Sequence, residues 1–126
     1  MQRIQIITGF LLLFILSGRI ASALNTKDLV AYPVPFNPKK GTVQYITIGN
    51  DPNKAPLSID KFKIEVYDIN GDKVCTRHYN SATAIWNGRN DNGVLVKPGM
   101  YIIKATVENT ATGEFGRKII RILINY

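Results

Sequence analysis

A side-chain period of two, followed directly by a turn dipeptide, most constrains the fold of this chain. Between positions 61 and 69, apolar side chains alternate with charged ones: Phe62, Ile64 and Val66 against Lys61, Lys63 and Glu65. Successive side chains of a β-strand point to opposite faces, so this segment is predicted to be a strand with one buried and one solvent-facing side. Asn70-Gly71 follows, and both positions accept the positive φ of a tight hairpin turn. A return strand over residues 72–79 is therefore expected.

Strand patterns recur along the rest of the chain, and helix patterns are nearly absent. Strands are predicted over residues 42–49 and 99–109. The last strand, over residues 115–125, is apolar on both faces near Ile119–Ile124, so it is predicted to be central or covered. About seven short strands separated by turns predict an all-β, antiparallel β-sandwich, and an up-and-down barrel is the alternative.

The first 23 residues have the layout of a secretory signal peptide. A positive end comes first, an apolar stretch follows, and the small residues Ala21 and Ala23 stand at cleavage spacing. A membrane anchor is the competing interpretation, but the apolar run is shorter than the roughly 20 residues of a spanning helix. Cleavage after Ala23 would leave no membrane span. The expected organisation is a signal peptide over 1–23, a proline-rich extended lead-in with a first edge strand over 24–40, and the sandwich over 41–126.

The charge balance is basic. The chain carries 16 Lys and Arg against 9 Asp and Glu, a net charge of +7, and cleavage would remove two of these cations, Arg3 and Arg19. The basic residues are spread along the chain without an aromatic cluster, so nucleic acid is not an expected partner. In an exported protein, such a charge balance is consistent with acidic envelope polymers or acidic proteins as partners. It is equally consistent with basic side chains that only keep the surface solvated.

The residue types of nucleophilic catalysis are present but badly placed. Cys75 is the only cysteine, so no internal disulfide forms, and a buried position would explain an unpaired thiol. His78, the only histidine, lies three residues later on the same predicted strand and therefore faces the opposite side. Ser81 lies near His78 without an acid to orient the ring. The sequence therefore predicts no enzyme activity.

Two clusters of Asp and Asn raise the question of a cation site. Asp68–Val74 begins like a calcium loop, but Lys73 and Tyr79 stand where such a loop needs a glycine and a bidentate acid. In the second cluster, Asn87–Gly93, Asp91 is the only acid and an arginine stands among the amides. Short Asn and Asp side chains often bond their own backbone in turns. Both clusters are therefore predicted to be turns, and no metal or cofactor is expected.

The second cluster and its flanks are predicted to form a structural corner of the sandwich. Its residues are Trp86, Gly88, Asp91, Gly93, Gly99 and Tyr101. Gly88 and Gly93 supply positive φ at no steric cost, and the indole of Trp86 is expected to pack in the core.

Four motifs in this order carry a family resemblance. They are YPVPFNP (32–38), IEVYDINGDKV (64–74), WNGRNDNGVLVKPGMY (86–101) and GRKIIRILI (116–124). Together they resemble the immunoglobulin-like domain first described in the flagellar hook-capping protein, which is related to C-terminal sorting domains of bacterial secreted proteins, including type IX secretion cargo. The resemblance implies an immunoglobulin-like sandwich with Trp86 as an anchor. Val34 replaces the usual Asn, and Asn87 and Asn90 replace Asp, which weakens any cation-binding role.

These observations favour an exported, non-catalytic module that mediates protein–protein interaction or assembly in a bacterial cell envelope. The expected location is the periplasm, the cell surface or the medium, and the expected partner is an envelope or secretion-machinery protein. The alternative is a type IX-like sorting or surface-attachment domain. A sorting domain normally follows a large cargo, whereas here the predicted signal peptide leads almost directly into the sandwich. Edge strands of the sandwich, which accept partner strands, are the expected contact sites.

Overall fold

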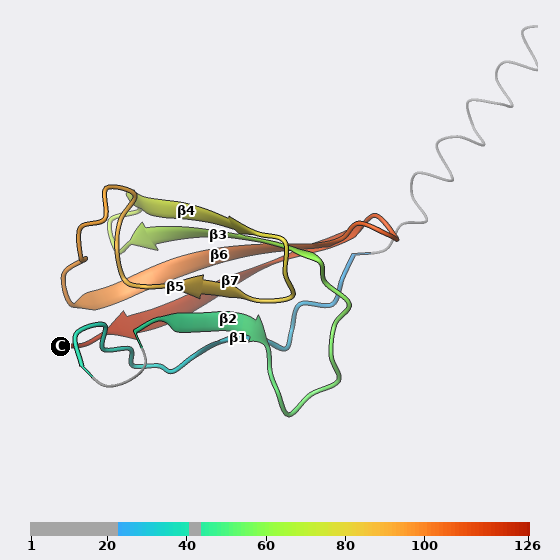
Figure 1. Cartoon of the computed structure of the whole chain (residues 1–126), viewed down its shortest axis with the longest axis horizontal. Coiled ribbons are helices and arrows are strands. Elements are labelled where there is room, and N and C mark those ends of the chain that lie inside the picture. Colours follow the sequence, from blue (N-terminus) through green and yellow to red (C-terminus); the bar gives the residue numbers. More distant parts are fainter. Residues whose placement is uncertain (1–22, 41–43) are drawn as a thin grey trace, which may run out of the picture.

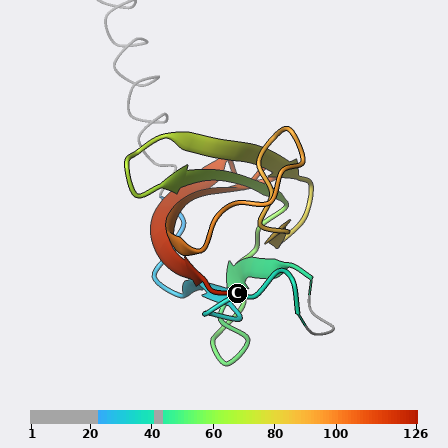
Figure 2. The same ribbon diagram turned by 90° about the vertical axis from the view of Figure 1, so that its left-hand side faces the viewer.

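A computed structural model of the chain describes residues 23–40 and 44–126. Within these ranges the chain forms seven strands and no helix: β1 (Leu29–Tyr32), β2 (Ile46–Asn50), β3 (Lys61–Asp68), β4 (Lys73–Tyr79), β5 (Ala84–Trp86), β6 (Gly99–Asn109) and β7 (Glu114–Ile124). They make two antiparallel sheets, of order β1-β2-β5 and β4-β3-β6-β7 (Figure 1). Figure 2 shows how the four-stranded sheet curves around the smaller one. The predicted all-β fold with two antiparallel sheets is confirmed.

The predicted signal peptide and its Ala21 lie outside the described residues, and the other cleavage residue, Ala23, is exposed. No described residue belongs to a helix long and apolar enough to cross a membrane.

The β3–β4 hairpin forms where the sequence pattern predicts it. Asp68 ends β3, and its Oδ1 accepts hydrogen bonds from the backbone N–H groups of Asn70 and Asp72, at 2.9 and 3.0 Å. Gly71 takes a φ of 86°, which its missing Cβ permits. The carboxylate of Asp68 thus organises the hairpin turn.

The hydrophobic core lies between the two sheets and draws on every strand. Its largest fully buried side chains include Trp86, Phe36, Phe62, Leu29, Ile46, Ile48, Ile64, Ile103, Ile122 and Ile124. The inward residues of β3 and β6 pair across the strands, as at Ile64 and Ala105. Such cross-strand pairs are the unit of stabilisation in a sheet.

Two predictions about solvent exposure need correction. Glu65 does lie on the outer face of β3, but it is only 8% exposed because Lys63, Lys73 and Tyr67 contact its carboxylate. An acid flanked by two ammonium groups and a phenol tolerates this burial because its charge is compensated.

The strand predicted to be central or covered is an edge strand, and the lead-in segment covers it only at its two ends. β6 is the only described strand that pairs with β7, which ends the four-stranded sheet. Its inward residues Ile122 and Ile124 are buried, whereas Ile119 and Leu123 face outward and are 57% and 38% exposed. The apolar residues on both faces therefore reflect a core face and an exposed apolar outer face.

The proline-rich lead-in joins the fold at both of its ends. β1 forms the first edge strand of the smaller sheet, and after two cis X-Pro bonds Phe36 inserts its side chain into the core. Phe36 also makes an isolated parallel bridge to Ile124. Residues 42 and 43 of the strand predicted over 42–49 lie outside the described residues, and β2 covers Ile46–Asn50.

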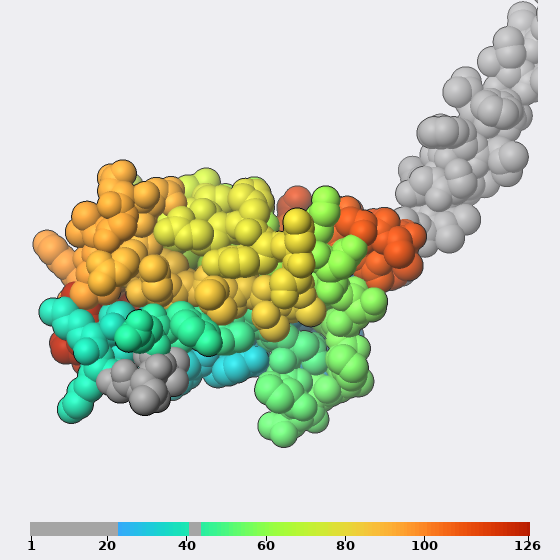
Figure 3. All heavy atoms as spheres, viewed as in Figure 1, coloured from blue at the N-terminus to red at the C-terminus, as the bar shows by residue number. Residues whose placement is uncertain are grey.

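The segment between β2 and β3 projects from the body of the molecule, as the green lobe in Figure 3 shows. This segment comprises residues 51–60 and contains Pro52 and Pro56.

Candidate functional site

The loop from β5 to β6 forms the candidate corner, at the end of the sandwich drawn in orange in Figure 1. Trp86 is the last residue of β5 and is buried, and its Nε1 donates a hydrogen bond to the carbonyl of Arg89 at 2.9 Å. Tyr101, near the start of β6, is also buried, and its hydroxyl donates to the carbonyl of Lys97 at 2.6 Å. Both aromatic residues therefore hold the loop through their polar atoms while their rings fill the core.

The amide side chains of the loop bind the loop's own backbone. Asn87 Oδ1 accepts a hydrogen bond from the N–H of Arg89 at 3.1 Å. Asn90 Oδ1 accepts two, from the N–H groups of Asn92 and Val94, each at 2.9 Å. These oxygens are occupied by turn hydrogen bonds, so they act as turn formers rather than as ligands.

The glycines of the corner take the backbone conformations that other residues avoid. Gly88 and Gly93 have φ values of 77° and 78°, and Gly99, the first residue of β6, has a φ of 148°. A Cβ on Gly88 would lie 3.3 Å from the Cβ of Pro38, which brings the lead-in segment close to the corner.

Asp91 links the corner to the four-stranded sheet. Its Oδ1 lies 2.5 Å from Nη1 of Arg77, and the Arg77 Nη2 reaches the carbonyl of Asn90 at 3.4 Å. The N–H of Thr76 also approaches this oxygen, at 3.4 Å. Asp91 is therefore neutralised by Arg77 of β4.

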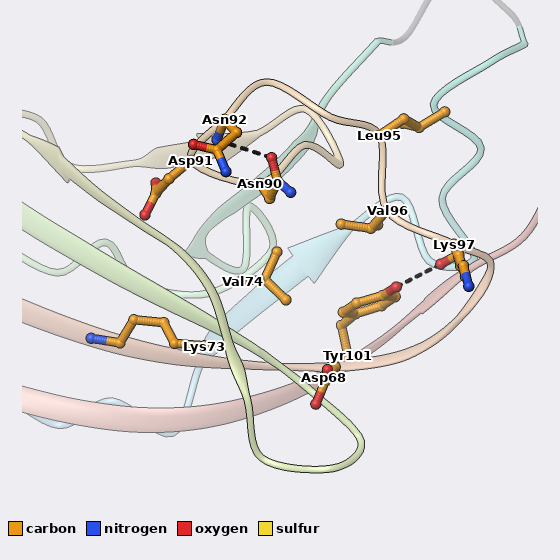
Figure 4. A pocket seen from close by; sticks show the side chains of 10 residues that line it. All are labelled: Asp68, Lys73, Val74, Asn90, Asp91, Asn92, Leu95, Val96, Lys97 and Tyr101. Carbon is orange, nitrogen blue, oxygen red and sulfur yellow. Dashed lines mark hydrogen bonds between the residues drawn. The ribbon is translucent and has the colours of Figure 1, made fainter.

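A pocket of about 510 Å³ opens between this corner and the β3–β4 hairpin (Figure 4). Val74, Val96 and Tyr101 form its apolar wall, and Asp68, Lys73 and Asp91 bring charge to it. Both carboxylates are already engaged, Asp68 by the hairpin backbone and Asp91 by Arg77. In the described part of the chain, no three His, Cys, Asp or Glu residues gather in a metal-binding group.

The residue types of nucleophilic catalysis do not come together. Cys75 is buried in the core, and this burial raises the pKa of its thiol. His78 is exposed on the opposite face of β4, where it pairs with Lys63 of β3. A buried thiol with a raised pKa is a poor nucleophile because the thiolate is the reactive form.

A second candidate is the free side of β7, which we call the β7 edge and define as residues Arg117–Leu123. The exposed apolar side chains of β7 alternate with two arginines on its outer face: Phe115, Ile119 and Leu123 with Arg117 and Arg121. Met100 of β6, 47% exposed, lies opposite Leu123 and extends the apolar surface. The sequence pattern showed the apolar residues but not that the strand ends its sheet, because strand order depends on distant pairings.

The fold defines the chain as an antiparallel two-sheet β-sandwich. No protein-family model and no curated protein matches the chain. Among solved structures, PorZ, an essential bacterial surface component of the type-IX secretion system of Porphyromonas gingivalis, is similar over 78% of this chain. The TM-score is 0.52 at 19% identity.

Two further structures are similar at lower scores. PorU from Porphyromonas gingivalis, solved as a latent dimer, has a TM-score of 0.48 at 20% identity over 78% of this chain. FlgD from P. aeruginosa has a TM-score of 0.42 at 19% identity, and the match covers 81% of this chain and 67% of FlgD. The chain spans only 11% of the PorZ chain and 9% of the PorU chain. The match to PorZ shows a related fold.

Proposed function

We propose that this chain is an exported, non-catalytic, immunoglobulin-like module that binds another protein in a bacterial cell envelope. The observation that carries this function is the β7 edge. It ends a sheet without a strand partner among the described residues, and it exposes Ile119 and Leu123 beside two arginines. Edge strands with exposed apolar side chains are surfaces that proteins use for pairing with other chains.

The corner supports a non-catalytic role. The amide oxygens of Asn87 and Asn90 accept hydrogen bonds from turn N–H groups, the one acid of the corner is paired with Arg77, and its tryptophan is buried. These groups hold the loop in its conformation, and the side chain of Val94 at the loop tip is exposed and available for contacts.

The fold similarity supports the envelope setting. PorZ is itself a bacterial surface component, and a related sandwich forms part of it. The same similarity favours a second candidate function, a type IX-like sorting or surface-attachment domain. The two candidates differ in what happens to the chain after export, because a sorting domain is processed by the secretion machinery.

The intact mass and the location of the native chain in fractionated source cells test this proposal. A chain cleaved after Ala23 and otherwise complete, recovered from the periplasm or the cell surface, is the expected result for a resident binding module. A chain with a shortened C-terminus, or one attached to surface polysaccharide, would establish the sorting function in its place. An uncleaved chain in the cytoplasm would refute both.

A further inference from the structure

The β7 edge is open only in its middle. Three hydrogen bonds show that odd-numbered residues of β7 point their C=O groups away from β6. Leu24 N–H donates to Phe115 O, Thr26 Oγ1 to Arg117 O and Phe36 N–H to Leu123 O, and just after the strand Asn125 N–H donates to Phe36 O. In an antiparallel strand, alternate residues direct their N–H and C=O groups to the same side, so the backbone groups of Ile119 and Arg121 also point away from β6. No strand in the described ranges pairs with these two residues. The open window is therefore short and lies between two segments of the chain's own lead-in.

A groove of about 410 Å³ runs beside this window, between β7 and β1. Its walls are mainly apolar, with Leu29, Ala31, Val34 and Ile120 among them. Lys118 crosses the seam between the sheets, and its Nζ donates to the carbonyls of Lys27 and Leu29 at 2.6 and 2.7 Å. The groove therefore offers an apolar floor beneath unpaired backbone groups.

The charged side chains on the outer face of β6 and β7 next to the window are basic. Arg117 and Arg121 flank Ile119 on the outer face of β7, and Lys104 of β6 lies opposite Ile119. Neither arginine forms an ion pair with a described residue. A strand that added here would place alternate side chains over the groove and beside the arginines.

We propose that the window of β7 and the groove beside it bind a short extended segment of a partner protein in which apolar and acidic side chains alternate. The backbone of this segment pairs with Ile119 and Arg121, its apolar side chains cover the groove, and its carboxylates meet Arg117 and Arg121. This inference rests on the proposed function and names the site and the partner chemistry for it.

Charge argues against a second copy of this chain as the occupant. The chain has 16 Lys and Arg against 9 Asp and Glu, and β7 paired with another β7 would bring Arg117 and Arg121 close to the same arginines. Like charges that face each other across strands are destabilising. The N–H and C=O groups of the window have no strand partner among the described residues. They favour a polypeptide over an anionic lipid surface, which offers no matching ladder of donors and acceptors.

The test uses the chain as recovered from its source cells and a synthetic probe, the capped peptide Ac-Val-Glu-Val-Glu-Val-NH2. Binding is followed by NMR through backbone shifts and amide hydrogen exchange. The expected result is that the amides of Ile119 and Arg121 shift and exchange more slowly, while that of Val94 at the corner does not. The matched peptide Ac-Val-Lys-Val-Lys-Val-NH2 is expected not to bind.

Three variants test which residues contribute to peptide binding. Arg121→Glu is expected to weaken the binding of the acidic peptide by roughly tenfold or more, because it opposes like charges at the contact. Lys54→Glu makes the same change of net charge in the exposed β2–β3 segment, and it is expected to leave the affinity unchanged. Ile119→Pro removes an N–H that has no ladder partner, a substitution that edge strands tolerate, and it is expected to abolish binding. If Ile119→Pro does not fold, the affinities of Arg121→Glu and Lys54→Glu for the acidic peptide are compared, and this comparison tests the inference.

Several outcomes overturn the inference. One is that the acidic peptide binds Arg121→Glu and the unchanged chain equally well, and another is that the NMR shifts that it causes are confined to other surfaces. A third is that the amide of Ile119 exchanges slowly before any peptide is added. A concentration-dependent dimer that involves β7 would also overturn the inference. Slow exchange without peptide would mean that the chain itself fills the window.

Photocrosslinking in cells separates this inference from the proposed function. A photoreactive residue replaces Ile119 or Val94, which are 57% and 59% exposed and so equally accessible. Crosslinks from Ile119 that disappear with Arg121→Glu support the site. Crosslinks to an envelope protein from Val94 alone would retain the module function and remove the β7 site. No crosslink from either position, in a chain found in the cytoplasm, would remove both.

Discussion

The rings of Trp86 and Tyr101 meet edge to face, with centroids 5.8 Å apart and planes inclined by 60°. Trp86 belongs to the three-stranded sheet and Tyr101 to the four-stranded sheet, so this contact joins the two layers at the corner end of the sandwich. An edge-to-face pair adds to the burial of both rings, and the Nε1 hydrogen bond ties the same tryptophan to the loop.

Replacement of Trp86 by alanine is expected to lower the free energy of unfolding by about 3–5 kcal/mol, because it removes a large buried side chain and leaves a cavity. Trp86→Phe is the matched control, which keeps an aromatic ring and loses the hydrogen bond to Arg89. It is expected to cost less than Trp86→Ala. Urea unfolding followed by circular dichroism measures both, since the fluorescence of the only tryptophan is lost. Equal stability of Trp86→Ala and the unchanged chain would show that the indole does not join the sheets.

Two of the three corner glycines, Gly88 and Gly93, have nearly equal φ values and so can be compared. Gly93→Ala is expected to lower the free energy of unfolding by about 1–2 kcal/mol, because a residue with a side chain is strained at a φ of 78°. No atom lies within 4 Å of the new Cβ, so no steric clash adds to this strain. Gly88→Ala carries a similar backbone strain and also brings its Cβ to 3.3 Å from Pro38, so it is expected to cost roughly 1 kcal/mol more. Urea unfolding of both variants measures the difference, and a larger loss for Gly93→Ala would contradict the close approach of the lead-in to the corner.

The local features of this fold were predictable because a few neighbouring residues determine them. The alternation along β3 and the turn at Asn70-Gly71 depend only on the strand period and on the φ values that the turn residues permit. Both appear in the structure, although only Gly71 takes a positive φ and Asn70 does not. The same holds for the turns of the second Asn cluster, where Asn90 binds the N–H groups of Asn92 and Val94.

The remaining features depend on pairings between residues far apart in the sequence. The pattern of β7 shows two apolar faces, but only the strand order makes it an edge strand. Phe36 lies among prolines with no period to reveal that it enters the core beside Ile124. Likewise, the contact between Arg77 and Asp91, which holds the corner against β4, joins two segments with no shared motif.

The thiol of Cys75 is expected to be inert in the folded chain. It is fully buried, and burial raises its pKa, so both access and the thiolate fraction are reduced. Reaction with an aromatic disulfide reagent at neutral pH should be at least about 100-fold slower in the native state than in denaturant, since it requires opening of the core. Ser81→Cys in a Cys75→Ala background places a thiol at an exposed loop and is the fast-reacting control. Rapid native labelling of Cys75 would show that the core opens on the reaction timescale.

Glu65 is expected to make the free energy of unfolding depend on pH in the acidic range. Its carboxylate lies 3.0 Å from Nζ of Lys73 and 3.6 Å from Nζ of Lys63, and the hydroxyl of Tyr67 donates to it at 3.2 Å. The hydrogen bond from Lys73 lowers the pKa of Glu65 more than burial raises it. Because the pKa of the folded state lies below that of the unfolded state, the unfolded chain binds more protons as the pH falls. The stability that Glu65 contributes is therefore fully present above the ordinary glutamate pKa of about 4.3 and is lost as the pH falls through the lower folded pKa.

Glu65→Gln tests this dependence because it removes the titration and keeps the shape of the side chain. Urea unfolding between neutral pH and about pH 3 should show a shallower loss of stability on acidification for Glu65→Gln than for the unchanged chain. Glu108→Gln, which removes another carboxylate from the outer face of the same sheet, is the matched control and should follow the unchanged chain more closely. If Glu65→Gln and the unchanged chain lose stability in parallel as the pH falls, the carboxylate is not held by Lys73 in solution, and the burial of Glu65 needs another compensating partner.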